Sequence, residues 1–171
     1  MALQATMRKF EIVLAHADKE LYETLELRVA QHPSEHLRYL VARVLARAFE
    51  HAEGLDFSKG GLSDTSEPAL IQRDLRGDLV AWIEVGEPSA DRLHKATKAC
   101  KRVVVYTWKA PALREAIAER GVHRAETIEI VELPQDFLDQ VAATVERQNH
   151  WDISVTGGVI YLTIKDQLYT C

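Results

Sequence analysis

The stretch LVAWIEVG, residues 79–86, constrains the fold of this chain more than any other feature. Five consecutive apolar residues, 79–83, precede a single carboxylate, Glu84. A strand that is apolar at successive positions is buried on both faces, as the central strands of α/β sheets are. The run therefore predicts a central strand. It leaves two interpretations of Glu84 open: an acid at the rim paired with Arg92 or Lys95, or an acid held in a pocket for chemistry.

Length and composition favour one globular domain. The chain has 171 residues, of which 47% are hydrophobic and 27% charged, a balance that allows a sizeable core and argues against disorder. Neither an apolar run of about 18 residues nor a secretory signal is visible, so we expect no membrane partner. The two cysteines, Cys100 and Cys171, cannot form a disulfide framework, which favours a reduced, cytoplasmic location. A monomer is expected.

Hydrophobic periodicity predicts an alternating series of strands and helices. The most secure element is a long helix that starts at Ser34, a good N-cap, and ends near Gly54. The predicted order is β-β-α-β-β-α-β-α-β-α-β-β, which indicates an α/β fold with a mixed β-sheet and flanking helices. The other elements are predicted at 7–16, 21–30, 69–74, 79–86, 90–100, 102–108, 110–121, 127–133, 134–148, 151–156 and 159–164.

Charge is distributed unevenly along the chain. The net charge of −5 argues against wholesale attraction to nucleic acid or to an anionic membrane. However, six basic residues and no acidic one lie between Arg92 and Lys109, which leaves 15 basic and 26 acidic residues elsewhere. This segment predicts a local positive face for nucleic acid or another anionic ligand, with Arg92, Lys95 and Lys98 as candidates. The alternative is a solvated helix face.

Several carboxylates are candidates for a metal site. Glu84 ends a central strand, where ligands of α/β sheets commonly bind, and Glu35 lies at the start of the long helix. Asp64 and Glu67 lie in the irregular segment 55–68. Carboxylates around Mg²⁺ or Mn²⁺, with a lysine such as Lys95 to position water or offset phosphate charge, form a minimal set for phosphodiester hydrolysis. Simpler roles are a helix-stabilising acid for Glu35, a turn former for Asp64 and a solvated side chain for Glu67.

Four segments carry a resemblance to a known family. RVAQHPSEH, GGLSDTSEPAL, WIEVGEPSADRLHKA and VVVYTW occur in an order that closely resembles the YaeQ family over nearly all of residues 1–165. The resemblance implies a single YaeQ-like domain over residues 1–171, built on a variation of the PD-(D/E)xK, restriction-endonuclease-like core with its metal-binding acids on a β-hairpin. It implies that Glu84 takes the place of the second acid of that motif and Glu35 that of the acid on the first helix. Lys95 would replace the lysine usually found on the strand.

The chain also departs from that motif. Gly86 stands where the in-strand lysine is expected, and Pro68 is followed by Ala69, so Asp64, Glu67 or Asp78 would have to replace the first acid. Two hypotheses follow: a metal-dependent phosphodiesterase or nuclease with Glu84 and Lys95 as catalytic residues, or a catalytically inactive nuclease-fold binding or regulatory module. Two carboxylates within about 5 Å of each other and unpaired with arginine would favour the first. A Glu84 engaged by arginine or lysine would favour the second.

Overall fold

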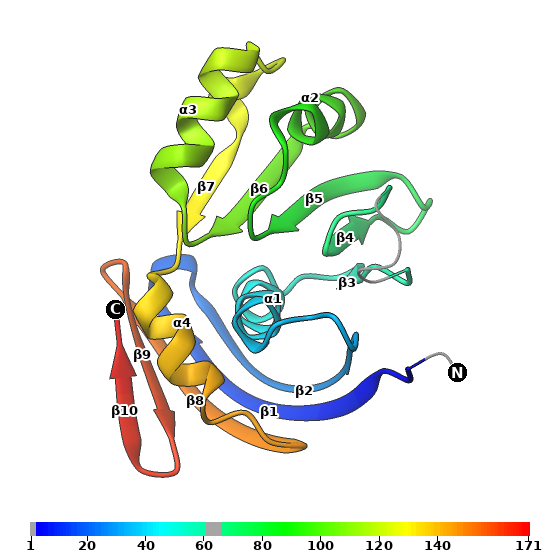
Figure 1. Ribbon diagram of the computed structural model, residues 1–171. Helices are drawn as coiled ribbons and strands as arrows, with labels where there is room; N and C mark the ends of the chain where they lie inside the picture. The colour runs from blue at the N-terminus through cyan, green and yellow to red at the C-terminus, as the bar shows by residue number, and fades with distance from the viewer. Residues whose placement is uncertain (1–2, 61–65) are drawn as a thin grey trace. The chain divides into compact units, whose positions relative to one another are not determined.

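The chain forms two compact units, each with its own β-sheet (Figure 1). The computed structural model describes residues 3–60 and 66–171. The first unit comprises residues 1–49 and 134–171, and the second residues 50–133. Within the described ranges the strands form two five-stranded mixed sheets. The predicted mixed α/β fold is therefore confirmed, with the strands divided between two sheets where the sequence had suggested one. No helix in these ranges is both long and apolar enough to cross a membrane.

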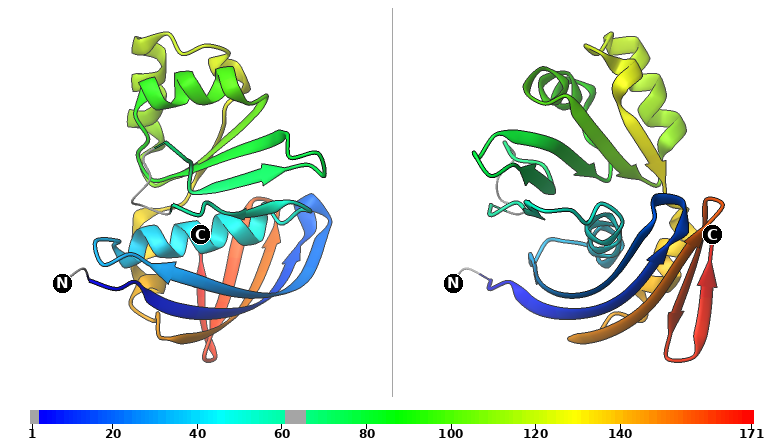
Figure 2. Two further views of the ribbon diagram at one scale, coloured as in Figure 1. Left: turned by 90° about the vertical axis from the view of Figure 1, so that its right-hand side faces the viewer. Right: turned by 180° about the vertical axis from the view of Figure 1, so that it is seen from behind.

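The first unit holds the chain's two ends. Its sheet has the strand order β10-β9-β8-β1-β2, with β1 parallel to β8 and antiparallel to β2, and the long, curved β1–β2 hairpin is plain in Figure 2. Helices α1 and α4 pack against each other, and Trp151 is fully buried with Phe10 at a ring-centroid distance of 4.9 Å. The elements are β1 (Thr6–His16), β2 (Leu21–Gln31), α1 (Leu37–Phe49), α4 (Gln135–Ala142), β8 (Gln148–Thr156), β9 (Val159–Ile164) and β10 (Gln167–Thr170), with a 3-10 turn at Ala17–Lys19.

The second unit carries Glu84. Its sheet has the order β3-β4-β5-β6-β7; β4 and β5 form an antiparallel hairpin, and β5, β6 and β7 are parallel. Helices α2 and α3 connect the parallel strands and lie side by side on one face of the sheet (Figure 1). Strand β5 lies between β4 and β6, which confirms the prediction of a central strand. The elements are β3 (Leu55–Phe57), β4 (Leu70–Arg73), β5 (Leu79–Val85), α2 (Ala90–Ala99), β6 (Arg102–Thr107), α3 (Ala110–Arg120) and β7 (Glu129–Glu132), with a 3-10 turn at Ala125–Thr127.

The long helix α1 is shorter than its apolar pattern predicted. It begins at Leu37 and not at Ser34, because His32 holds the preceding residues in a turn. The backbone N–H of Ser34 donates to His32 Nδ1 (3.1 Å), and the N–H of Glu35 donates to the His32 carbonyl (2.9 Å). The helix ends at Phe49, and Gly54 instead forms the turn before β3 with φ of +80°.

Two further boundaries differ near the C-terminus. The helix predicted over 134–148 ends at Ala142, and β8 begins at Gln148, three residues before the predicted strand. Strand β10 was not predicted, and neither was β3, which occupies the start of the segment 55–68 that was predicted to be irregular. The β9–β10 turn uses Lys165 and Asp166, both with positive φ (49° and 65°), so the glycine signal that marks the β8–β9 turn is absent.

Candidate functional site

Glu84 is buried at the C-terminal end of β5 and accepts two hydrogen bonds on one oxygen. Only 6% of its side chain is exposed. Its Oε1 accepts from Trp82 Nε1 at 2.8 Å and from Arg92 Nε at 2.5 Å. Trp82 precedes Glu84 by two residues on the same strand, so both side chains point to the same face of the sheet. Arg92 lies in the first turn of α2, where the N-cap Ser89 accepts its backbone N–H (3.1 Å).

Arg92 makes a second contact that fixes its guanidinium. Its terminal nitrogen donates a hydrogen bond to the main-chain carbonyl oxygen of Glu67, in the segment that leads into β4. The guanidinium therefore connects the end of β5, the first turn of α2 and the chain before β4. The sequence had left Arg92 and Lys95 as alternative partners of Glu84, and the structure pairs Glu84 with Arg92.

The environment of Glu84 acts on its pKa in opposite directions. Burial raises the pKa of the carboxyl above its usual range, and the indole donor of Trp82 and the charge of Arg92 lower it, with burial prevailing. A buried carboxylate stays ionised in the folded protein only if hydrogen bonds and a positively charged partner compensate for the loss of water. The observed contacts supply both.

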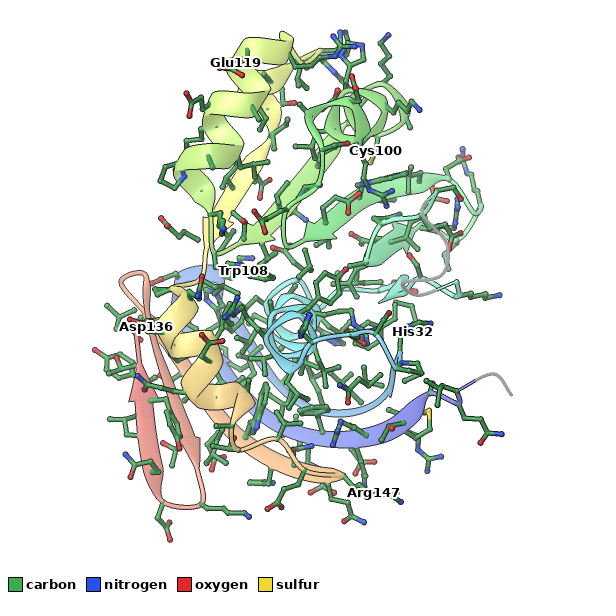
Figure 3. The ribbon with its side chains drawn as sticks, in the orientation of Figure 1. His32, Cys100, Trp108, Glu119, Asp136 and Arg147 are labelled. Atoms are coloured by element: carbon green, nitrogen blue, oxygen red, sulfur yellow. The ribbon has the colours of Figure 1, made fainter. Side chains whose placement is uncertain are left out.

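Glu35 is likewise buried and paired with arginine, within the first unit. It lies in the turn before α1, and its side chain is 1% exposed. Arg43, from α1, donates to both carboxylate oxygens at 3.0 and 3.1 Å and also to the carbonyl of Ala30 at 2.9 Å. The backbone N–H of His32, labelled in Figure 3, donates to Glu35 Oε2 at 3.1 Å. Burial raises the pKa of Glu35, and Arg43 acts against that rise.

The remaining candidate ligands are Asp64, Glu67 and Asp78. Asp64 lies outside the described residues. Glu67 contributes its main-chain carbonyl to Arg92, and its carboxylate makes no hydrogen bond or ion pair with another described residue. Asp78 is exposed in the β4–β5 turn, where its N–H donates to Asp74 Oδ1 (2.9 Å).

In the structure both buried carboxylates, Glu84 and Glu35, are engaged by arginine. Mg²⁺ demands near-octahedral coordination by oxygen, and Arg92 already occupies an oxygen of Glu84. Across residues 3–60 and 66–171, no group of three or more His, Cys, Asp or Glu side chains is arranged to hold a metal ion. Glu35 and Glu84 belong to different units, and each has its own arginine.

Two contributors to the Glu84 site were missed in the sequence. Trp82 was not singled out, although its position two residues before Glu84 on a strand places both side chains on one face. The Glu67 carbonyl had no signal, because a main-chain acceptor carries no side-chain identity. Two arginines of α1 also form ion pairs: Arg38 with Asp139 of α4, and Arg43 with Glu35.

The basic segment presents four exposed lysines, of which Lys109 forms an ion pair with Glu87 at 3.8 Å. Of the other three, Lys95 and Lys98 lie on α2, and Lys101 lies two residues beyond its end. Among the residues that the structure describes, none of the three lysines has a hydrogen-bond or salt-bridge partner. Arg102, by contrast, pairs with both Glu50 and Glu129. The segment's free positive charge is therefore carried by lysines.

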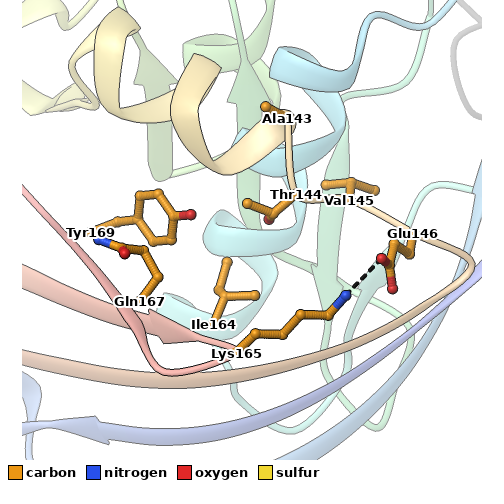
Figure 4. Close-up of a pocket in the computed structure, with 8 residues that line it drawn as sticks. All are labelled: Ala143, Thr144, Val145, Glu146, Ile164, Lys165, Gln167 and Tyr169. Atoms are coloured by element: carbon orange, nitrogen blue, oxygen red, sulfur yellow. Dashed lines mark hydrogen bonds and ion pairs between the residues drawn. The ribbon is translucent and has the colours of Figure 1, made fainter.

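A separate pocket of about 290 Å³ lies in the first unit, between the α4–β8 connection and the β9–β10 hairpin (Figure 4). Two of its lining residues form an ion pair, between Lys165 Nζ and Glu146 Oε1 at 2.7 Å. None of the predicted site residues lines it. The lining residues are Ala143, Thr144, Val145, Glu146, Ile164, Lys165, Gln167 and Tyr169.

Comparisons with known proteins find one family over nearly the whole chain. The family model described as YaeQ protein matches residues 1–171. The uncharacterized protein YaeQ of Escherichia coli (strain K12) is 28% identical over 168 residues, covering 95% of this chain and 91% of that protein. The crystal structure of YaeQ protein from Pseudomonas syringae has a TM-score of 0.88 at 31% identity, covering 97% of this chain and 92% of its own. The YaeQ protein from Xanthomonas axonopodis pv. citri also has a TM-score of 0.88, at 28% identity, with 97% and 94% covered.

Proposed function

The chain belongs to the YaeQ family, and from that premise we propose that it is a non-catalytic, nuclease-fold binding module whose ligand is the phosphate backbone of a nucleic acid. One observation carries the non-catalytic part of this proposal: Arg92 and Trp82 both donate to Glu84. A metal-dependent hydrolase needs the oxygens of its acids free to bind the ion. Here the acid that would anchor such a site contributes to the joint between β5 and α2.

The binding part rests on the lysines of α2. Residues three apart are neighbours on a helix surface, so Lys95 and Lys98 share one face, and Lys101 continues the same spacing beyond the helix end. Exposed ammonium groups attract phosphate and release its counterions. If three phosphates of duplex DNA are neutralised, a plot of the logarithm of the binding constant against the logarithm of salt concentration should have a slope of about −2.7.

Fluorescence anisotropy with labelled single-stranded DNA, duplex DNA and RNA tests this binding. We expect wild type to bind with a salt dependence near that slope, and the triple variant K95A/K98A/K101A to lose most of both the affinity and the slope. The matched control K9A/K59A/K165A removes the same charge from other places on the chain. Equal weakening by both triple variants would show that overall charge, and not the face of α2, is responsible, and would reject the assignment.

A second candidate is metal-dependent phosphodiester hydrolysis. It is favoured by the position of Glu84 on the β4–β5 hairpin of a mixed sheet, the arrangement that the family resemblance implies for metal-binding acids. Its ligands would be Glu84 with Asp64 or Glu67, and Lys95 would act on the phosphate with Mg²⁺ or Mn²⁺ bound. Cleavage of DNA or RNA by wild type with either metal, lost in both E84A and K95A, would establish this candidate and overturn the first.

A further inference from the structure

We infer that Arg92 is the resident cation of the Glu84 site: its guanidinium occupies the place that a divalent metal ion would take, and replacing it with a neutral side chain creates a metal site. This inference deepens the proposed non-catalytic function, on which it rests, because it states why the site excludes metal. The observation behind it is the convergence of two oxygen acceptors, Glu84 Oε1 and the carbonyl of Glu67, on one guanidinium.

The acceptors around Arg92 are of the kind that hard cations prefer. Carboxylate and main-chain carbonyl oxygens are both ligands of Mg²⁺ and Mn²⁺. They come from two different segments, β5 and the chain before β4, and the guanidinium holds the two together. The carboxylate of Glu67 belongs to the same residue as one of these acceptors and makes no hydrogen bond or ion pair within residues 3–60 and 66–171.

The charge of Arg92 explains why metal does not compete. A buried carboxylate requires a positive partner, and an arginine side chain supplies one that is covalently attached and never deprotonates. An incoming metal ion would have to displace the guanidinium from Glu84 Oε1 and from the Glu67 carbonyl, and would meet its repulsion at close range. The indole N–H of Trp82 donates to the same Glu84 oxygen and stays in place when Arg92 is replaced, so the carboxylate remains oriented.

Four variants test the inference: R92Q and R92A remove the charge, R92K keeps it, and R92Q/E84Q removes the acid as well. Each is followed by thermal unfolding and by calorimetry with MnCl₂ alone. We expect no Mn²⁺ response from wild type or R92K. R92Q and R92A should bind Mn²⁺, with a melting temperature raised by about 2–4 °C when the ion is present at about five times its Kd. R92Q/E84Q should again show no response.

Two outcomes overturn the inference: equal Mn²⁺ binding by wild type and R92Q, or no binding by a folded R92Q or R92A. Making both neutral variants keeps the test valid if one of them fails to fold. The result is separable from the proposed function, because all four proteins retain Lys95, Lys98 and Lys101. Loss of nucleic-acid binding in the lysine variants and gain of Mn²⁺ binding in R92Q are independent measurements, and either can fail alone.

Discussion

Replacing Arg43 with methionine should destabilise the first unit severely, because it leaves the buried Glu35 without its cation. Arg43 and Glu35 are 8% and 1% exposed, and three hydrogen bonds join Arg43 to the two carboxylate oxygens and to Ala30. Methionine keeps the length and apolar stem of the side chain, so the loss is mainly that of the charge and its hydrogen bonds. Removing one partner of a buried ion pair costs about 3–5 kcal/mol, a large part of a total stability of about 5–15 kcal/mol.

Chemical unfolding of four proteins measures this cost. Wild type, E35Q, R43M and E35Q/R43M are compared in a W82F/W108F background, in which fluorescence reports only on Trp151 of the first unit. The double variant leaves no unpaired charge, so we expect a coupling energy of about 2–3 kcal/mol between the two positions. R38M is the matched control on the same helix, since Arg38 and its partner Asp139 are 32% and 44% exposed, and its loss should be much smaller.

Two results would refute this reasoning. One is a loss below about 1 kcal/mol for R43M, which is the range of an exposed ion pair. The other is that R43M lowers the free energy of unfolding by the same amount in the wild-type protein as in the E35Q protein. Either result would mean that Glu35 does not depend on Arg43, and its carboxylate would again be a candidate ligand.

Three further predictions concern the second unit. Burial raises the folded-state pKa of Glu84 above its ordinary value of 4.5. Its contribution to stability is therefore complete below pH 4.5 and is lost as pH rises through the folded-state pKa. In urea titrations, the unfolding free energy of wild type relative to E84Q should fall from pH 4.5 upward. G54A should cost at least about 1–3 kcal/mol by the same assay, because φ is +80° and a Cβ would lie 1.9 Å from the Arg73 carbonyl oxygen. Y106F should lower the free energy of unfolding by about 1.5–3 kcal/mol, because it removes the 2.6 Å hydrogen bond from the Tyr106 hydroxyl to the buried Glu50 carboxylate. An unchanged free energy of unfolding in G54A or Y106F, or no dependence on pH for Glu84, would contradict the corresponding argument.

Local patterns in the sequence predicted most elements, because burial on one or both faces leaves a direct record in residue type. The run at 79–83 identified β5, and the alternation at 7–16 and 21–30 identified the β1–β2 hairpin. The partner of each strand left no such record. Strand β8 pairs in parallel with β1, whose first residue lies more than 140 positions earlier in the chain, and this pairing places β8–β10 in a different sheet from β5.

The candidate site was also predicted in part. Its acids were found, but of the groups that bind them only Arg92 was named as an alternative. Glu84 was singled out because a carboxylate is unusual at the end of an apolar run, and Glu35 because it lies at the start of the long helix; both are buried. Whether a buried acid is neutralised by metal or by arginine depends on side chains that meet only after folding. The turn at His32 illustrates the difficulty, because it moves the helix start past Glu35 and turns that carboxylate toward Arg43.

The two acid–arginine pairs nevertheless share a spacing that sequence reasoning can use. In each, an acid before a helix is bound by an arginine eight residues later on that helix: Glu35 by Arg43 and Glu84 by Arg92. Lys95 is eleven residues beyond Glu84, and its side chain is exposed on α2. Arginine suits this role better than lysine because its planar guanidinium can donate to a carboxylate and to a main-chain carbonyl at once, as both arginines do. A buried acid followed at this distance by an arginine is therefore better interpreted as a strand–helix joint than as a metal ligand, and the R92Q and R43M experiments test that interpretation in separate units of the chain.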